Sequence, residues 1–201
     1  LDDMFEKLSK DQLSNLPEIP MPAALTQDLF DHQVQGIRWL YQRETGDKPV
    51  PFYKKLKERG QDVWFSEITN SSQQTTPQPV KGGILADDMG LGKTLQAIGL
   101  MLANPPKPDA KNKTTLILCP VSVMPNWFQQ IENHVKPDTL KVAMYHGPGR
   151  YDLLSKLDEI DVLVASYGTI STDYGNEFPK EGKENKPKKK KRKTTGSSII
   201  Q

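Results

Sequence analysis

The prediction of the fold rests on the stretch GGILADDMGLGKT, residues 82–94. Its apolar start, Ile84–Ala86, predicts a short strand, and Lys93 and Thr94 open an amphipathic helix, with glycine-punctuated residues between them. Glycines let consecutive backbone N–H groups turn toward an anion, and the N-terminus of a helix adds the positive end of its dipole. The sequence therefore predicts a phosphate-binding loop between a strand and a helix.

In such a loop the lysine reaches the β- and γ-phosphates of a nucleotide and the following hydroxyl ligates Mg²⁺. Lys93 and Thr94 are accordingly the candidate catalytic residues, and Thr94 is the candidate magnesium ligand. The candidate nucleotide-binding residues of the loop are Asp88, Met89, Gly90, Leu91, Gly92, Lys93 and Thr94. A strict Walker loop begins with glycine where this chain has Asp87, so a glycine-rich turn with an incidental lysine is the alternative.

The composition and net charge of the chain exclude several classes of protein. The 201 residues suit one domain with a good-sized core, and a net charge of +2 gives no overall nucleic-acid signature. Positive charge is concentrated in residues 176–196, which hold nine Lys/Arg against three acids. Cys119 is the only cysteine, which excludes an internal disulfide and a multi-cysteine metal site. The longest apolar stretch, Leu116–Met124, is too short and too interrupted to cross a membrane.

From residue 81 onward, predicted strands and helices alternate. The strands are 84–86, 114–119, 141–145 and 161–165, and the helices are 95–102, 126–134 (capped by Asn126) and 150–157. Thr114–Cys119 is almost continuously apolar, as expected of a strand buried on both faces of a parallel sheet. The alternation predicts a doubly wound, mostly parallel α/β sheet, in which ligands bind beyond the carboxyl ends of the strands.

Residues 1–28 are predicted to be a lead-in and a proline-containing linker, and residues 29–43 a helix with Asp31 as its N-cap. Gln33 lies at the start of that helix. Its amide offers a donor and an acceptor side by side, which is the pattern that reads the adenine edge. Taken alone, the local sequence favours the alternative of a solvated glutamine on a surface helix.

Two segments are predicted to be irregular. Residues 44–80 read as an insertion whose aromatic pairs, Phe52-Tyr53 and Trp64-Phe65, pack as a flap over the core. Residues 171–198 form a polar excursion, and its basic part, 174–198, is predicted to be a disordered loop. Within it, Pro187–Lys193 matches a nuclear import signal read by an import receptor, or a patch that contacts phosphates. A purely solvated charge run is the alternative.

With these motifs in place, the chain resembles the first RecA-like lobe of Swi/Snf-type ATPases, a branch of the superfamily-two helicases. LFDHQVQGIRWL (29–40) resembles the family's adenine-reading motif, with Gln33 at the contact position. DDMGLGKT (87–94) resembles its phosphate loop, in which an acid also stands at the position of Asp87. LILCPVSVMPNW (116–127) and VLVASYGTI (162–170) resemble the two motifs that face DNA.

The resemblance implies a P-loop NTPase lobe over residues 29–201 that uses ATP and Mg²⁺. It also implies a DNA-dependent ATPase that translocates on double-stranded DNA in the nucleus, in chromatin remodelling or DNA damage tolerance. Chromatin or replication-repair proteins are the further candidate partners. The residues implied to contact DNA are Ser122, His146, Ser166 and Tyr167, with Trp127 equally suited to the core. A nuclear DNA-binding scaffold with a vestigial nucleotide site is the alternative. A small-molecule kinase is disfavoured, because it leaves the Gln33 helix and the Pro-Val-Ser turn without a use.

A narrower resemblance is to the helicase-like transcription factor group of RING-containing DNA repair translocases. It is carried by LDDMFEKL (1–8), PVPFYKKL (49–56) and WFSEITN (64–70). The family's water-activating Asp-Glu pair would follow the next strand, beyond Gln201, and its arginine finger belongs to the second lobe. We therefore expect residues 1–201 to be an incomplete lobe that hydrolyses almost no ATP by itself.

Overall fold

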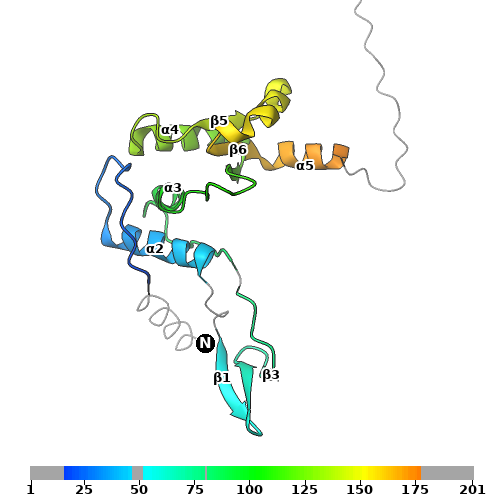
Figure 1. The fold of residues 1–201 in the computed structure, drawn as a ribbon. Coiled ribbons are helices and arrows are strands. Elements are labelled where there is room, and N and C mark those ends of the chain that lie inside the picture. Colours follow the sequence, from blue (N-terminus) through cyan, green and yellow to red (C-terminus); the bar gives the residue numbers. More distant parts are fainter. Residues whose placement is uncertain (1–15, 47–51, 80, 178–201) are drawn as a thin grey trace, which may run out of the picture.

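The computed structural model describes residues 16–46, 52–79 and 81–177. These residues form an α/β body and a separate antiparallel sheet (Figure 1). The predicted import signal, Pro187–Lys193, and the N-terminal LDDMFEKL segment lie outside the described residues. No helix in the described ranges is long and apolar enough to cross a membrane.

A parallel sheet is the centre of the α/β body. Its order is β4 (Thr115–Cys119), β6 (Val162–Ser166), β5 (Val142–Tyr145), and both pairings are parallel. All five residues of β6 are buried, as is usual for the central strand of a parallel sheet that is covered on both faces. The α/β class with a parallel sheet is therefore confirmed.

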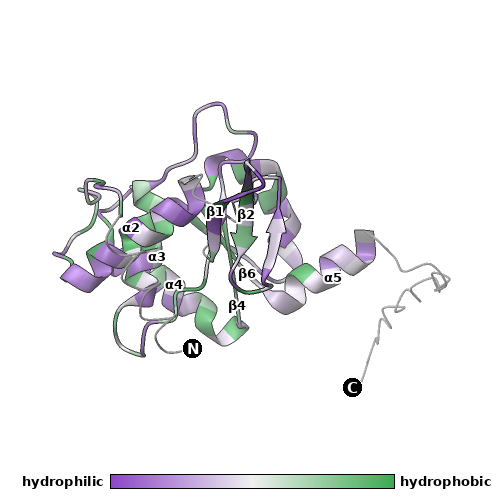
Figure 2. Ribbon diagram, turned by 90° about the horizontal axis from the view of Figure 1, so that it is seen from below, coloured by the Kyte–Doolittle hydropathy of each residue, from purple (hydrophilic) through white to green (hydrophobic). Residues whose placement is uncertain are grey.

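Three helices lie on one side of this sheet. These are α2 (Asp31–Thr45), α3 (Lys93–Ala103) and α4 (Met124–His134). Figure 2 shows them to one side of β4 and β6, with α5 (Tyr167–Glu177) extending from the other. In Figure 1, α3 lies between α2 and the layer that holds α4. The middle position explains why Ile98 of α3 and Ile37 of α2 are both fully buried.

Three of the predicted helices, at 29–43, 95–102 and 126–134, are α-helices in the structure, but the predicted N-caps of two of them are wrong. Phe30, rather than Asp31, is the N-cap of α2, so Asp31 becomes its first helical residue. Helix α4 begins at Met124, two residues before the predicted cap Asn126. The reason is Pro125, because proline has no N–H to leave unpaired and its fixed φ suits the first turn of a helix.

Strand β4 corrects a prediction about burial. Its sequence predicts a strand covered on both faces, yet Leu116 is 50% exposed and Leu118 is 36% exposed. The opposite face is covered, since Ile117 and Cys119 join the core formed with α3, α4 and β6. Strand β4 stands at the edge of the described sheet, and the elements over the other face pack on β5 and β6 instead.

Segment Ile84–Ala86 is not a strand in the structure. Among the described residues it has no ladder partner, and the Ile84 side chain is 87% exposed. The segment before it is tied to α2, because Gly82 N donates to Arg43 O at 3.0 Å and Arg43 Nε donates to Gly82 O at 2.9 Å. An apolar run alone therefore does not form a β-strand, because the backbone hydrogen bonds of a strand require an adjacent strand.

The insertion at 44–80 is more regular than we predicted. It contains a three-stranded antiparallel sheet of β1 (Tyr53–Glu58), β2 (Gln61–Ser66) and β3 (Ser71–Gln73). Arg59 and Gly60, both with positive φ, make the two-residue turn that matches the twist of a hairpin. Figure 1 draws this sheet away from β4, β5 and β6, so it is not the flap over the core that its aromatic pairs suggested.

Two further corrections concern the last described segments. The predicted α-helix at 150–157 is a 3-10 helix, η2 (Pro148–Glu159). Residues 171–177, assigned to a polar excursion, continue α5, which begins at Tyr167. Ile170 of α5 packs with Leu157 of η2 against β5 and β6, so the start of α5 is packed on the sheet.

The segment before α2 is bound to the end of α4. Leu25 pairs with Val135 in an antiparallel bridge, flanked by hydrogen bonds from Thr26 N to His134 O at 3.0 Å and from Lys136 N to Ala24 O at 2.9 Å. Leu25 is 9% exposed and belongs to the main core. Part of the predicted lead-in is thus a structural component of the α/β body.

Candidate functional site

The candidate phosphate loop has the backbone that its glycines predict. Gly90 has φ 89° and Gly92 has φ 82°, values that other residues rarely adopt. Gly92 has a second reason to be glycine, because a Cβ there would lie 2.5 Å from Gln33 Nε2. Helix α3 starts at the next residue, so its free N–H groups point back to the loop.

Lys93 is held against the loop. Its Nζ donates to Asp87 O at 2.6 Å and to Asp88 O at 2.8 Å. These bonds keep a positive charge beside the backbone that would surround an anion. Lys93 therefore lies against the loop, and its role in binding phosphate stays a prediction.

A cavity of about 560 Å³ opens beside the loop, within the range typical of ligand sites. From the loop and α3 it is lined by Met89, Gly90, Gly92, Lys93, Thr94 and Leu95. From the start of α4 it is lined by Val123, Asn126, Trp127, Gln129 and Gln130. Sequence reasoning missed Asn126 and Gln130, although their spacing of four residues places them on one helix face. Trp127 also packs against the main core.

Gln33 lies beside the loop and is only 6% exposed, so the alternative of a solvated glutamine is wrong. Its Oε1 accepts a hydrogen bond from Phe30 N at 3.1 Å, and its Nε2 donates to Leu91 O at 3.4 Å. His32 Nε2 lies 3.1 Å from the same Leu91 oxygen, and its ring stacks on Phe30 with a centroid distance of 5.8 Å. The start of α2 and the phosphate loop are thus joined at one carbonyl.

The four residues predicted to contact DNA follow the carboxyl ends of the parallel strands. Ser122 (in η1, Val121–Val123), His146 and Tyr167 are exposed there. Ser166 is different, because it is 4% exposed and its Oγ accepts a hydrogen bond from Thr169 N at 3.1 Å. That bond is the pattern of a serine that caps the start of a helix, here α5.

Near the same edge, an ionic network binds α5 to β5 and η2. Asp173 accepts hydrogen bonds from Arg150 Nη2 at 2.6 Å, Tyr151 OH at 2.8 Å and Tyr145 OH at 2.9 Å. The bond from Arg150 is the main reason that the pKa of Asp173 lies well below its usual range. Burial, followed by the bond to Asp173, raises the pKa of Tyr145.

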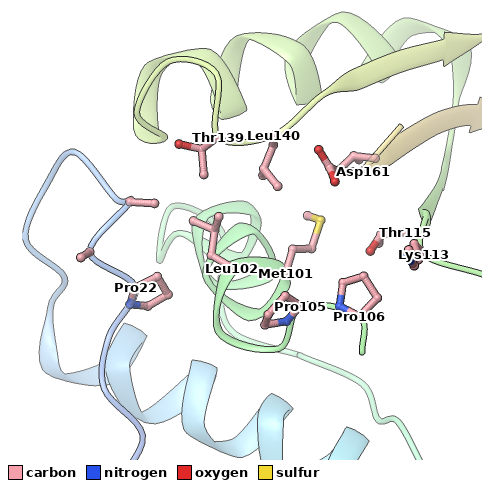
Figure 3. Close-up of a pocket in the computed structure, with 13 residues that line it drawn as sticks. Pro22, Met101, Leu102, Pro105, Pro106, Lys113, Thr115, Thr139, Leu140 and Asp161 are labelled. Carbon is pink, nitrogen blue, oxygen red and sulfur yellow. The ribbon is translucent and has the colours of Figure 1, made fainter. Parts of the chain in front are cut away.

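A second cavity, of about 340 Å³, opens at the amino ends of β4 and β6 (Figure 3). Pro22, Met101, Leu102, Pro105, Pro106 and Leu140 give it a mainly apolar lining. Because it includes Thr115 and Val162, the first residues of those strands, it lies at the end of the sheet opposite to the candidate DNA contacts. Within the described ranges, no group of three or more His, Cys, Asp or Glu side chains could hold a metal ion.

The chain is similar to a known family and to several known proteins. Residues 32–199 match the SNF2-related domain. The human helicase-like transcription factor is 34% identical over 159 residues, which cover 77% of this chain and 14% of that protein. A putative SWI/SNF-related matrix-associated actin-dependent regulator of chromatin (subfamily A member 3-like 1) from Arabidopsis thaliana is 30% identical over 77% of this chain and 22% of its own length. The DNA repair protein RAD5B of the same plant is 29% identical over 80% of this chain and 16% of its length.

Proposed function

The chain belongs to the SNF2-related family, and on that premise we propose that residues 29–201 are the ATP-binding lobe of a DNA-dependent ATPase that translocates on duplex DNA. It spans roughly a fifth of the length of the relatives it matches, or less, so the activity belongs to the whole protein. The names of the relatives place them in chromatin regulation and DNA repair. We therefore propose a nuclear protein that acts in those processes.

The observation that carries the proposal is the cavity beside the phosphate loop. Glycines in the left-handed region, the Lys93 ammonium and the N-terminus of α3 all lie at one side of it. This donor set fits a polyphosphate, since backbone N–H groups, a lysine and a helix dipole each favour negative charge. ATP is the nucleotide that the family implies.

Each residue has a defined part in holding the nucleotide. The backbone from Asp88 to Gly92 surrounds the phosphates, Lys93 binds them by charge, and the Thr94 hydroxyl, which lines the cavity, is the proposed ligand of Mg²⁺. When bound, Mg²⁺ neutralises charge on the phosphate oxygens. In the whole protein, hydrolysis also needs groups that position and activate the attacking water.

Gln33 is proposed to read the adenine edge without leaving its present position. A glutamine amide has two N–H donors and two acceptor lone pairs. One acceptor is used by Phe30 N and one donor by Leu91 O, so one of each remains for a base. The existing bonds orient the amide, which reduces the entropy lost when the base binds.

The duplex is proposed to lie along the carboxyl ends of β4, β5 and β6. Ser122, His146 and Tyr167 are exposed there and offer a hydroxyl, an imidazole and a phenol to the DNA backbone. Ser166 acts indirectly, by capping the start of the helix that carries Tyr167. Trp127 faces the nucleotide cavity and the core rather than this edge.

The proposal is tested by Lys93→Ala in the full-length natural protein. Loss of the phosphate-binding charge should lower DNA-stimulated ATP hydrolysis by about 100-fold or more, as removal of a transition-state donor does. Lys111→Ala, which removes an exposed lysine from the loop after α3, is the matched control. Full activity in the Lys93 variant would exclude the motor and favour a DNA-binding scaffold with a vestigial nucleotide site.

A further inference from the structure

Gln96, on α3, is a buried polar side chain that the nucleotide site described above does not use. It has no exposed surface. Its Nε2 donates to Asp87 Oδ2 at 2.8 Å and lies 3.5 Å from Leu91 O. A carboxylate and a carbonyl can only accept hydrogen bonds, so the nitrogen of this amide must face the loop.

The other end of the amide faces helix α2. A Cβ added to Gly36 would lie 1.7 Å from Gln96 Oε1, so only a glycine in α2 leaves room for this side chain. Among the described residues, Oε1 is buried and has no hydrogen-bond partner. A half-satisfied buried amide costs stability. We therefore look for the role of Gln96 in the half of the amide that is hydrogen-bonded, which is the nitrogen that donates to Asp87.

Asp87 stands where a strict Walker loop has glycine, and it brings a carboxylate to the phosphate loop. Its own carbonyl accepts a hydrogen bond from Lys93 Nζ at 2.6 Å, so the residue is adjacent to the charge that would bind phosphate. A carboxylate free to turn toward a bound polyphosphate would repel it and compete for Lys93. The bond to Gln96 holds the carboxylate on the inner side of the loop.

We propose that Gln96 is a positioning residue for phosphate binding: its buried amide restrains the Asp87 carboxylate, and Gly36 provides the space for that amide between α2 and α3. This inference rests on the proposed function, since it requires that the loop binds a polyphosphate. Gln96 itself touches no nucleotide. It acts through Asp87 and, more weakly, through the carbonyl of Leu91.

The test is a double-mutant cycle in the full-length natural protein, with the dissociation constant of Mg·ATP measured by calorimetry. Gln96→Met keeps the length of the side chain and removes the donor, and should weaken ATP binding by about 10-fold, the size of a single charge repulsion in a partly screened site. In the Asp87→Asn background the same Met substitution should change affinity by less than about 2-fold, because no charge remains to be restrained.

Gln96→Glu is the second variant; it keeps the size of the side chain, and its combination with Asp87→Asn restores a hydrogen bond at this buried position, so the proposal stays testable should Gln96→Met fail to fold. It places a carboxylate against Asp87 and should weaken ATP binding more than Met does. Combined with Asp87→Asn it should regain most of the affinity, since the introduced amide can donate to the introduced carboxylate. Inorganic tripolyphosphate should follow the same order as ATP, and adenosine should not.

The outcomes separate this inference from the proposed function. If wild-type protein binds Mg·ATP and Lys93→Ala weakens that binding, the function stands. Equal losses for Gln96→Met with and without Asp87→Asn would then show a purely structural glutamine and overturn the inference alone. If the wild type binds no Mg·ATP, both the proposed function and the inference are wrong.

Discussion

At the scale of single residues, two glycines of the phosphate loop share a backbone conformation and differ in their surroundings. Both Gly90 and Gly92 have a positive φ, which costs an alanine roughly 1–2 kcal/mol. A Cβ at Gly90 would meet nothing within 4 Å, whereas one at Gly92 would meet Gln33 Nε2. Substituting both glycines therefore distinguishes the cost of backbone strain, which the two share, from the cost of the contact with α2, which only Gly92 has.

We expect Gly92→Ala to lower the free energy of unfolding by about 1 kcal/mol more than Gly90→Ala does. The additional loss is that of the Gln33 hydrogen bonds to Phe30 and Leu91, which the new methyl group displaces. Urea denaturation of both variants measures the difference. Equal losses of unfolding free energy in the two variants would show that α2 moves to accommodate the methyl group at no cost.

Asp173 carries a prediction about pH. Because Arg150 depresses its pKa in the folded state, its contribution to stability is present above the unfolded value, about 3.9, and is lost as the pH falls toward the folded pKa. The melting temperature of the wild type should therefore exceed that of Asp173→Asn at pH 7, and the two should converge as the pH drops below about 4. Asp158→Asn removes an exposed carboxylate of η2 outside this network and controls for net charge. A gap that stays constant with pH would contradict the assignment.

The residues of the candidate site differ in how far the sequence reveals them. The conformations of Gly90 and Gly92 and the place of Lys93 follow from local chemistry, because neighbours along the chain build the loop. The roles of Gln96 and Gly36 could not be predicted, since they arise where two helices, 60 residues apart in the sequence, come into contact. The burial of Gln33 was missed for the same reason.

At the scale of elements, α2 and α3 approach closely at Gly99. A Cβ at this position would lie 2.4 Å from Cδ1 of Ile37, a side chain with no exposed surface. Gly99→Ala should therefore lower the free energy of unfolding by about 1–2 kcal/mol, although alanine is the better helix former by about 1 kcal/mol. Thermal denaturation followed by circular dichroism measures this change.

Gly175→Ala is the matched control for that prediction. Gly175 is exposed in α5, and an added Cβ would meet nothing within 4 Å. Helix propensity alone should then raise stability by up to about 1 kcal/mol. Opposite signs at the two glycines are expected. A gain at both would show that the α2–α3 contact accommodates a methyl group at no cost.

The elements also show why a sequence pattern predicts that a strand forms better than it predicts which elements will cover or pair with that strand. The apolar residues of β4 and β6 predicted two strands, and both form, but only β6 has elements packed on both of its faces. Residues 84–86 have similar composition and no partner strand in the described part of the chain. The sheet β1–β3 was missed because its strands carry many charged residues, such as Lys54 and Lys55, which pair with Glu67 and Asp62 on the exposed sheet.

At the scale of the whole molecule, the segment before α2 contributes to the core. Leu25→Ala should lower the free energy of unfolding by about 2–4 kcal/mol, because it empties a buried position between the segment and the end of α4. Leu154→Ala, at a position 48% exposed on η2, should cost less than about 0.5 kcal/mol. Chemical denaturation of the two variants provides the measurement, and equal effects would place residue 25 outside the folded unit.

The bridge between Leu25 and Val135 also has a mechanical consequence. Tension on the chain ahead of residue 24 reaches the two backbone hydrogen bonds that flank the bridge before it reaches α2. The force then passes into α4, whose opposite end carries Asn126 and Trp127 beside the phosphate loop. A load applied to the upstream chain is thus passed through α4 to one wall of the cavity beside the loop.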